Sequence, residues 1–188
     1  MALSKAGGEG GNREDWKLLC QINAQTVSNE NRTYFNVKGR IIGTGRNPLY
    51  KACGNNGCLK KVRDNPNGTF YCEKCNVDRT TEFQWRLILS VAISDCTAES
   101  WITLFQEQGE KLLGMTAQQL SELQEESPQQ FLKALSAAEF KQFVFRIGSR
   151  METYMDETKV KSVAYQFTPI DPIKQSKQLI KNIRQWTQ

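Results

Sequence analysis

The sequence predicts a mainly β fold that also contains helices, and three observations support this prediction. Several stretches alternate between apolar and polar side chains, which is the period of a strand with one buried face. Two close pairs of cysteines interrupt this pattern early in the chain. A last segment places its apolar residues at helical spacing. We therefore expect one strand-based domain with a small insertion and a closing helix.

The insertion is defined by two cysteine pairs, Cys53 with Cys58 and Cys72 with Cys75. Residues 65–68, Asn-Pro-Asn-Gly, lie between the pairs and predict a hairpin turn. Paired cysteines at this spacing are typical of a zinc ribbon, in which four thiolates hold one tetrahedral ion. The alternative is two disulfides in a secreted domain.

The predicted zinc is structural rather than catalytic. Four sulfur ligands fill a tetrahedral site and leave no position for water or substrate. The chain has no histidine, which is the usual ligand of catalytic zinc and the commonest general base. The sequence also lacks a glycine-rich phosphate loop and a carboxylate pair at meaningful spacing. We therefore expect a protein that is not an enzyme, with structural Zn²⁺ as its cofactor.

Composition divides the chain into three parts. Residues 1–12 are rich in small residues without periodicity, so we expect a flexible linker or a segment added by cloning. Residues 13–170 form the expected main domain, with the ribbon inserted at about 47–79, and residues 171–188 form the closing helix. No apolar run is long enough to cross a membrane, so we expect no membrane partner. Cys20 and Cys96 lie outside the ribbon without obvious partners, which favours a reducing compartment.

Five segments have the strand period, and a helical stretch at 106–135 separates the third from the fourth. The strands are expected at residues 33–43, 83–94, 99–105, 141–154 and 160–168. This order, with an insertion after the first strand, is typical of the OB-fold, a five-stranded barrel whose strand faces bind single-stranded nucleic acid. In the last strand we expect Val163, Tyr165 and Phe167 to share one face.

Aromatic and basic side chains fall on the expected outer faces of these strands. Ile102 and Leu104 are expected core residues, so Trp101 and Phe105 point outward, and two exposed aromatics on one face need a reason. A basic outer face on a single strand is usually only solvated, but several strands agree here. Rings stack on bases, and cations meet phosphates. The candidate nucleic-acid-binding residues are Trp101, Phe105, Tyr154, Lys38, Arg40, Arg86, Arg146, Arg150, Lys60 and Lys61.

The closing helix begins with Asp171 and Pro172, a favourable pair for an N-cap and first helical position. An isolated helix of this length is marginal in water, so it must pack on another surface. The residues alone leave open whether that surface is its own barrel or another subunit. Its apolar stripe, the candidate partner-binding surface, consists of Ile173, Leu179, Ile180, Ile183 and Trp186.

From residue 15 to its C-terminus the chain resembles one family, the C-terminal OB domain of the replication protein A large subunit. The ribbon inserted early in an OB barrel is specific to this group. The resemblance rests on residues 15–17, 49–53, 58–62, 71–75, 86–91, 105–107 and 152–154, with Trp101, Asp156 and Glu157.

This resemblance implies a function for each part. The four ribbon cysteines hold structural zinc in the family, and aromatics matching Trp101, Phe105 and Tyr154 lie in a groove for single-stranded DNA. The last helix joins a three-helix bundle with the middle and small OB-fold subunits of a heterotrimer, which implies that another subunit covers the apolar stripe. The resemblance therefore implies a nuclear protein of DNA replication, repair and recombination.

Two alternatives stay open. Residues 44–46 and 185–188 depart from the common replication subunit. This departure leaves room for a paralogue that binds telomeric single strands as a telomerase processivity subunit, with telomerase as its partner. The second alternative is a module kept mainly for subunit assembly, with weak affinity for DNA.

Overall fold

The structure is a computed structural model that describes residues 15–22, 27, 31–55, 57–79, 83–154 and 157–186, so the predicted linker at 1–12 lies outside the described residues. Its elements are a 3₁₀ turn (Leu19–Gln21), β1 (Thr33–Thr44), β2 (Leu49–Cys53), β3 (Arg63–Asp64), β4 (Phe70–Cys72), β5 (Val77–Arg79), β6 (Phe83–Ser94), β7 (Glu99–Phe105), α1 (Gln106–Leu113), α2 (Ala117–Glu126), α3 (Pro128–Ser136), β8 (Gln142–Tyr154), β9 (Glu157–Pro169) and α4 (Pro172–Trp186). The chain is thus mainly β with helices, as predicted.

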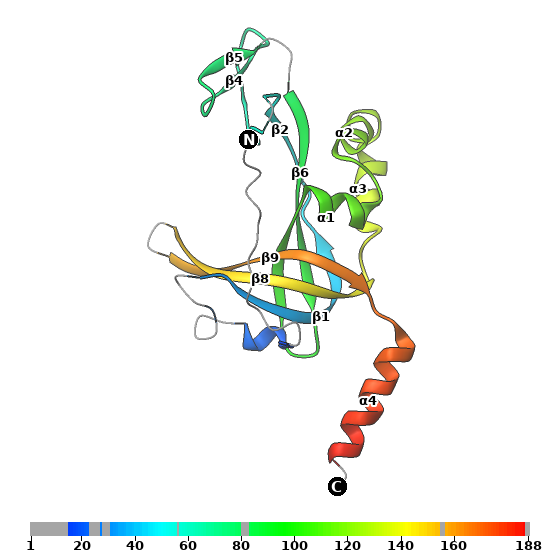
Figure 1. The fold of residues 1–188 in the computed structure, drawn as a ribbon. Coiled ribbons are helices and arrows are strands. Elements are labelled where there is room, and N and C mark those ends of the chain that lie inside the picture. Colours follow the sequence, from blue (N-terminus) through cyan, green and yellow to red (C-terminus); the bar gives the residue numbers. More distant parts are fainter. Residues whose placement is uncertain are drawn as a thin grey trace.

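The larger sheet contains all five predicted strands. Its order is β1-β8-β9-β7-β6-β2, and β1 also pairs with β6, so the pairings return to the first strand (Figure 1). Every pairing in this sheet is antiparallel except β7 with β9, which pair in parallel through two residue pairs. The observed β6 and β7 have the predicted bounds, and the other three strands differ from prediction by one to three residues at an end.

The core lies between two groups of strands. Alternate residues of β1 and β8, such as Val37 and Phe145, pack against Leu89 of β6 and Ile102 of β7 in one buried cluster. Because successive strand residues point to opposite sides, the residues between them form the outer faces. The outer face of β1, β8 and β9 therefore points away from the outer face of β6 and β7.

One predicted face in β9 was wrong. Val163 and Phe167 are buried, but Tyr165 between them is exposed. The pairing of β8 with β9 shifts register between Arg146 and Ile147, so Tyr165 is an extra residue opposite this step. Such a bulge reverses the alternation locally and sends the Tyr165 ring outward.

Helices α1 and α2 pack on β6, and α3 packs on α2 and β1, so the three helices lie together on one side of the strands (Figure 1). Gly109 of α1 permits close contact, because a Cβ there would lie 2.5 Å from Cδ2 of buried Leu87. Thr116 caps α2 by accepting a hydrogen bond from the Gln119 backbone N–H at 3.2 Å. The helices therefore close one side of the core and leave the outer face of β7 free.

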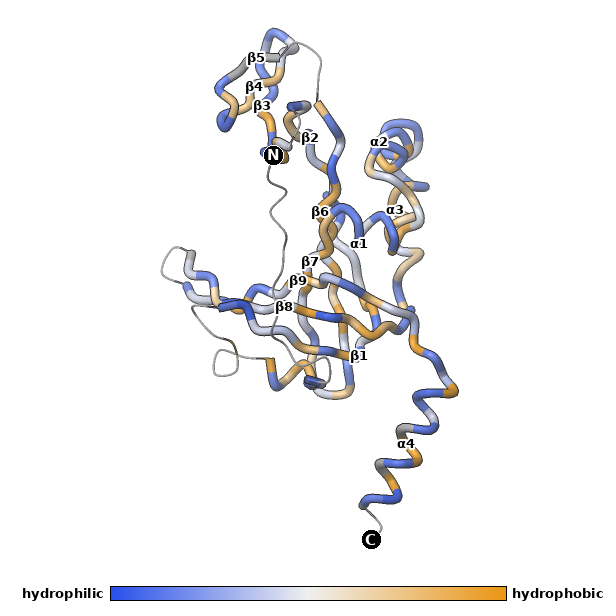
Figure 2. Tube along the Cα trace, in the orientation of Figure 1, coloured by the Kyte–Doolittle hydropathy of each residue, from blue (hydrophilic) through white to orange (hydrophobic). Residues whose placement is uncertain are grey.

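The last helix projects away from the strands (Figure 1). Asp171 caps it, because its carboxylate accepts hydrogen bonds from the backbone N–H groups of Ile173 and Lys174. Figure 2 shows hydrophobic and hydrophilic positions alternating along α4. Within the described residues, no helix is long and apolar enough to span a membrane.

Candidate metal centre and nucleic-acid interface

The four predicted ligands meet beside a small second sheet of order β3-β4-β5, with Cys53 at the end of β2, Cys72 at the end of β4, and Cys58 and Cys75 in the two loops. Their sulfur atoms all lie within 4.8 Å of one another. The Sγ atoms of Cys53 and Cys75 are 3.9 Å apart, and those of Cys58 and Cys72 are 3.8 Å apart. Zinc–sulfur bonds of about 2.3 Å in a tetrahedron place sulfurs about 3.8 Å apart. The four thiols therefore fit a tetrahedral ion.

Local backbone geometry brings these cysteines together. Gly57 has a φ of 79°, which turns the first loop, and the Cys58 N–H donates to the Asn55 carbonyl at 2.9 Å. In the second loop, Asn76 has a φ of 52° and its N–H donates to the Cys72 carbonyl at 2.8 Å. The Asn55 backbone N–H alone would lower the pKa of the Cys53 thiol, but burial and hydrogen bonds with the other three ribbon thiols outweigh it and raise this pKa to about 11. The Cys75 backbone N–H is the strongest of several hydrogen bonds that lower the pKa of the Cys72 thiol to about 7. A thiol with this pKa readily becomes the thiolate that a metal requires.

The ribbon is held to the larger sheet by a lysine that the sequence analysis missed. The Lys51 ammonium of β2 lies 4.7 Å from the Phe70 ring of the ribbon, and 5.1 Å and 5.9 Å from the rings of Phe83 and Trp85 at the start of β6. It also pairs with Asp64 of the ribbon at 3.3 Å. The contact with Phe70 and the ion pair with Asp64 therefore join the two sheets, and the contacts with Phe83 and Trp85 hold the ammonium against the larger sheet. Residues 49–53 were predicted only as part of the insertion and not as a strand, and no local pattern indicated the rings around Lys51.

The outer face of β6 and β7 carries the two predicted aromatics. Trp101 is 61% exposed and Phe105 is 49% exposed. Trp101 lies opposite Ala92, and Phe105 lies opposite Ile88, which is itself exposed. The sequence analysis did not select Ile88, although its position in the alternation placed it on this face. Trp101, Phe105 and Ile88 therefore form an apolar surface that solvent reaches, and Ala92 is buried opposite Trp101.

Arg86 borders this surface, as predicted. It lies opposite Tyr50 of β2 and on the same face of β6 as Ile88. Its Nε atom is buried, and no hydrogen-bond acceptor for it is present among the described residues. Lys60 and Lys61 are exposed on the ribbon. A cation with an unused donor thus lies beside the aromatic surface, and two more lie on the ribbon.

The β8–β9 hairpin carries Arg150 and Tyr154. The Tyr154 backbone pairs with Glu157, but its side chain lies outside the described part of the structure. Arg150 Nε donates to Glu152 at 2.8 Å, and Lys161 pairs with the same carboxylate at 3.1 Å. Arg150 and then Lys161 lower the pKa of the Glu152 carboxyl. The hairpin surface therefore has a fixed ionic network.

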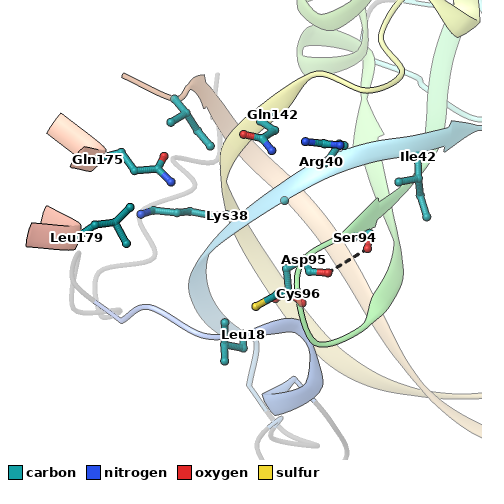
Figure 3. A pocket seen from close by; sticks show the side chains of 12 residues that line it. Leu18, Lys38, Arg40, Ile42, Ser94, Asp95, Cys96, Gln142, Gln175 and Leu179 are labelled. Atoms are coloured by element: carbon teal, nitrogen blue, oxygen red, sulfur yellow. Dashed lines mark hydrogen bonds between the residues drawn. The ribbon is translucent and has the colours of Figure 1, made fainter. Parts of the chain in front are cut away.

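The remaining predicted cations lie on a different face. Lys38 and Arg40 are on the outer side of β1, and Arg146 is on the outer side of β8 opposite Asn36. Lys38 and Arg40 line a cavity of about 630 Å³ between β1, the β6–β7 turn and α4, where Lys38 extends toward Leu179 (Figure 3). The alternation of apolar and polar residues predicted that these side chains point away from the core. It does not tell on which outer face of the larger sheet they lie. The predicted nucleic-acid-binding residues are thus divided between two surfaces.

The predicted partner surface lies on α4. Ile173, Leu179, Ile180 and Ile183 are each at least half exposed, and the side chain of Trp186 lies outside the described ones. Leu179 borders the cavity of Figure 3, but the other three side chains do not line it. The barrel therefore covers little of this stripe.

Comparison with known families identifies the group to which this architecture belongs. The family model for the replication factor-A C-terminal domain matches residues 34–179. This chain belongs to that family. The matched range includes the ribbon, the five predicted strands of the larger sheet apart from Thr33, and the first half of α4.

Relatives agree with this family. The chain is 39% identical over 186 residues to the replication protein A 70 kDa DNA-binding subunit of Xenopus laevis, covering 98% of this chain and 30% of the relative. It is 38% identical over 133 residues to replication factor A protein 1 of Saccharomyces cerevisiae, covering 70% of this chain and 21% of the relative. The chain thus spans less than a third of the length of these relatives.

Solved structures of the family share the fold. One is a replication protein A heterotrimer bound to single-stranded DNA, with a TM-score of 0.83 and 32% identity over 95% of this chain and 41% of that chain. Another is yeast replication protein A bound to single-stranded DNA, with a TM-score of 0.77 and 30% identity over 90% of this chain and 96% of that chain. These relatives favour the general replication subunit and lend no support to telomerase as a partner.

Proposed function

We propose that this chain binds single-stranded DNA on the outer face of β6 and β7 as part of a replication protein A-like assembly. The observation that carries the proposal is the pair of exposed rings, Trp101 and Phe105, on the outer face of a strand whose intervening residues, Ile102 and Leu104, point into the core. The family relatives, of which two solved examples hold single-stranded DNA, support the same ligand. Exposed aromatic surface of this kind is otherwise costly in water.

The proposal gives a chemical role to the groups on this face and to residues of the ribbon and of the β8–β9 hairpin. Bases stack on Trp101, Phe105 and Tyr154, and Ile88 widens the apolar floor. Stacking contributes roughly 1–3 kcal/mol per base and tolerates any base. Arg86, with its unused Nε donor, meets a phosphate at the edge, and Lys60, Lys61 and Arg150 add salt-dependent attraction.

The proposed architecture is a five-stranded OB barrel over residues 13–170 that carries a zinc ribbon at about 47–79. The circular pairing of β1, β8, β9, β7 and β6 supports the barrel, and the sulfur distances support zinc. Cys53, Cys58, Cys72 and Cys75 would hold the ion, which supplies structure and no reaction step because four sulfurs fill its coordination shell. The protein we propose is accordingly not an enzyme.

Residues 171–188 are the proposed assembly segment. The exposed stripe of Ile173, Leu179, Ile180 and Ile183, with Trp186, needs an apolar cover that the described barrel does not supply. The smaller OB-fold subunits of a replication protein A-like heterotrimer would supply it through a helical bundle. This assembly would act in the nucleus, in DNA replication, repair and recombination.

The test of DNA binding is a fluorescence-anisotropy titration of the whole chain. Wild type and the Trp101→Ala/Phe105→Ala variant are compared on a mixed-sequence and a G-rich oligonucleotide across a salt series. We expect the variant to bind at least tenfold more weakly, because about 1–3 kcal/mol is lost per unstacked base. The control is Phe140→Ala, which removes an equally large ring that is 71% exposed elsewhere.

Three other outcomes would contradict the proposal. Equal affinity of wild type and the double variant would remove the β6–β7 face from binding. No binding by the wild type would leave the assembly module. A strong preference for the G-rich strand would favour the telomeric paralogue over the general subunit.

The test of assembly uses Ile180→Asp/Ile183→Asp, co-expressed with the two smaller subunits of a replication protein A heterotrimer. We expect the partners to be lost on purification while DNA affinity of the isolated chain stays within twofold, because α4 projects away from the β6–β7 face (Figure 1). Recovery of both partners with the variant would show that α4 is not the assembly element.

A further inference from the structure

We propose that the outer face of β1, β8 and β9 is a second contact surface for single-stranded nucleic acid. The outer patch, as we name it, consists of Arg32, Tyr34, Lys38, Arg146 and Tyr165. The inference rests on the proposed function, because it assigns the same ligand class to the opposite face of the same barrel. It concerns a longer strand than the β6–β7 face alone can hold.

The patch combines rings and guanidinium groups in direct contact. The rings of Tyr34 and Tyr165 lie 5.5 Å apart. The Arg32 guanidinium lies over the Tyr165 ring at 5.5 Å and also donates to its hydroxyl group. The Arg146 guanidinium lies over the Tyr34 ring at 5.7 Å. Both aromatic rings and arginine planes are surfaces on which unpaired bases stack.

A third aromatic–cation pair extends the patch along β1. Residues Asp15 to Lys17 run beside β1, with the Lys17 N–H donating to the Asn36 carbonyl at 3.0 Å and the Asn36 N–H donating to the Asp15 carbonyl at 2.7 Å. This contact places the Trp16 ring, which is 50% exposed, 5.4 Å from the Lys38 ammonium. Rings and cations thus alternate along one outer face.

Cations predominate on this face. Its strands β1, β8 and β9 contain six lysines and arginines against two glutamates, Glu152 and Glu157, which pair with Arg150, Lys161 and Lys159. Arg32 adds a further cation, and its buried Nε has no acceptor among the described residues. A face that attracts polyanions and retains an unused donor is suited to phosphate groups.

The geometry favours a nucleic acid over an acidic peptide. An acidic peptide would use the cations and would not need Tyr165 outside the core. The bulge opposite Arg146 turns Tyr165 outward at the cost of a core position, and Gly148 lies beneath it without a side chain to block the rings. The outward rings next to cations match the requirements of a sequence-tolerant single strand.

The experiment compares a short oligonucleotide of about 8 nucleotides with one of about 30, since one OB-fold binds roughly 4–16 nucleotides. The test variant is Lys38→Gln/Arg146→Gln. The matched control is Lys133→Gln/Lys177→Gln, which removes two exposed cations on α3 and α4. We expect the test variant to lose roughly tenfold in affinity for the long strand and much less for the short one. We also expect its salt slope on the long strand to fall by about 1.4, at about 0.7 for each phosphate contact.

A second measurement uses the wild-type protein, so it does not depend on the variants folding. A 30-nucleotide strand that carries 5-bromodeoxyuridine is photo-crosslinked, and the modified residues are mapped by mass spectrometry. We expect crosslinks at Tyr34, Tyr165 or Trp16 in addition to Trp101. Crosslinks confined to the β6–β7 face, or equal losses for the test and control variants, would overturn the proposal.

The outcomes separate this inference from the proposed function. If Trp101→Ala/Phe105→Ala leaves the short strand bound, the proposed function fails at its own site. If that variant fails to bind the short strand while the test variant holds the long strand normally, only the second surface is refuted. Competition of the long strand by polyglutamate, with no tyrosine crosslinks, would assign the patch to an acidic peptide and refute the proposal.

Discussion

Gly148 is the residue on which the geometry of the outer patch depends. A Cβ at this position would lie 2.7 Å from Tyr165 Cε2, 2.8 Å from Arg32 Cδ and 2.9 Å from Tyr34 Cε1. We expect Gly148→Ala to displace at least one tyrosine ring and to lower the free energy of unfolding by about 1–3 kcal/mol, as other overpacked positions do. Chemical denaturation measures this loss.

Gly43→Ala is the matched control, because its nearest neighbour is the Ala92 Cβ at 4.0 Å, which is ordinary contact. We expect Gly43→Ala to change stability by less than about 0.5 kcal/mol. Equal stabilities for the two variants would mean that the rings move away from Gly148 without cost.

Among the elements, the ribbon depends on Lys51 for its position on the larger sheet. We expect Lys51→Met, which keeps the aliphatic stem and removes the charge, to cost about 1–2 kcal/mol through the lost cation–π contacts. The loss should appear as faster exchange of the Val62 amide, which donates to the Lys51 carbonyl at 3.0 Å. We expect Lys51→Arg, which keeps the positive charge, to retain part of the protection of the Val62 amide against exchange.

Lys51 lies on the face of β2 opposite Tyr50, so it does not border the proposed stacking surface. Any loss of DNA affinity in Lys51→Met would therefore report ribbon position rather than a lost phosphate contact. Lys74→Met, an exposed lysine of the ribbon, is the control. Unchanged amide exchange in Lys51→Met would refute the role of Lys51 as a link between the two sheets.

The turn between β6 and β7 depends on the ionised form of Asp95. Burial alone would raise its pKa, but hydrogen bonds from the Thr97 hydroxyl and from the backbone N–H groups of Leu19, Thr97 and Ala98 outweigh burial and lower it. A pKa that is lower in the folded state stabilises the fold fully above the unfolded value of about 3.8, and this contribution is lost as the pH falls through the folded pKa.

We expect Asp95→Asn to lower stability at pH 7 by about 1.5–3 kcal/mol, the range for hydrogen bonds to a charged group. The difference from wild type should shrink as the pH falls below about 4. Urea denaturation at pH 7 and pH 3 measures both values, with the exposed Glu99→Gln as control. A difference that stays constant between the two pH values would refute the contribution of the charge.

At the scale of the whole molecule, the ribbon and the main domain have separate buried clusters. Cys53, Cys58, Val62 and Cys72 form one cluster, and the strands and helices of the main domain form the other. We therefore expect a metal chelator to expose the four ribbon thiols to a thiol reagent while the far-ultraviolet circular dichroism changes little. DNA affinity should fall, because Lys60 and Lys61 lose their fixed positions.

Chelation that unfolds the whole chain in one step would contradict the independence of the two clusters. Chelation that exposes the thiols without a change in affinity would confirm the metal site and remove the ribbon from DNA binding. If the thiol reagent modifies all six cysteines before the chelator is added, the ribbon thiols hold no metal.

Much of this molecule could be predicted from its sequence, because strand alternation and cysteine spacing are local patterns. Trp101 and Phe105 were predicted to be exposed from Ile102 and Leu104 alone. Tyr165 was assigned wrongly because a bulge depends on the partner strand. Local patterns could not predict that Lys38 and Trp101 lie on opposite outer faces of the sheet. That arrangement depends on the pairing of β1 with β6, which joins strands far apart in the sequence.

The projecting helix α4 has a consequence for the lifetime of the protein in a cell. Ile173, Leu179, Ile180 and Ile183 stay in contact with water as long as no other chain covers them. A newly made copy without the proposed partner subunits therefore exposes an apolar surface of the kind that chaperones and proteases recognise on unfolded chains. We expect the cellular concentration of this protein to follow that of the proposed partner subunits, because copies in excess of them are degraded.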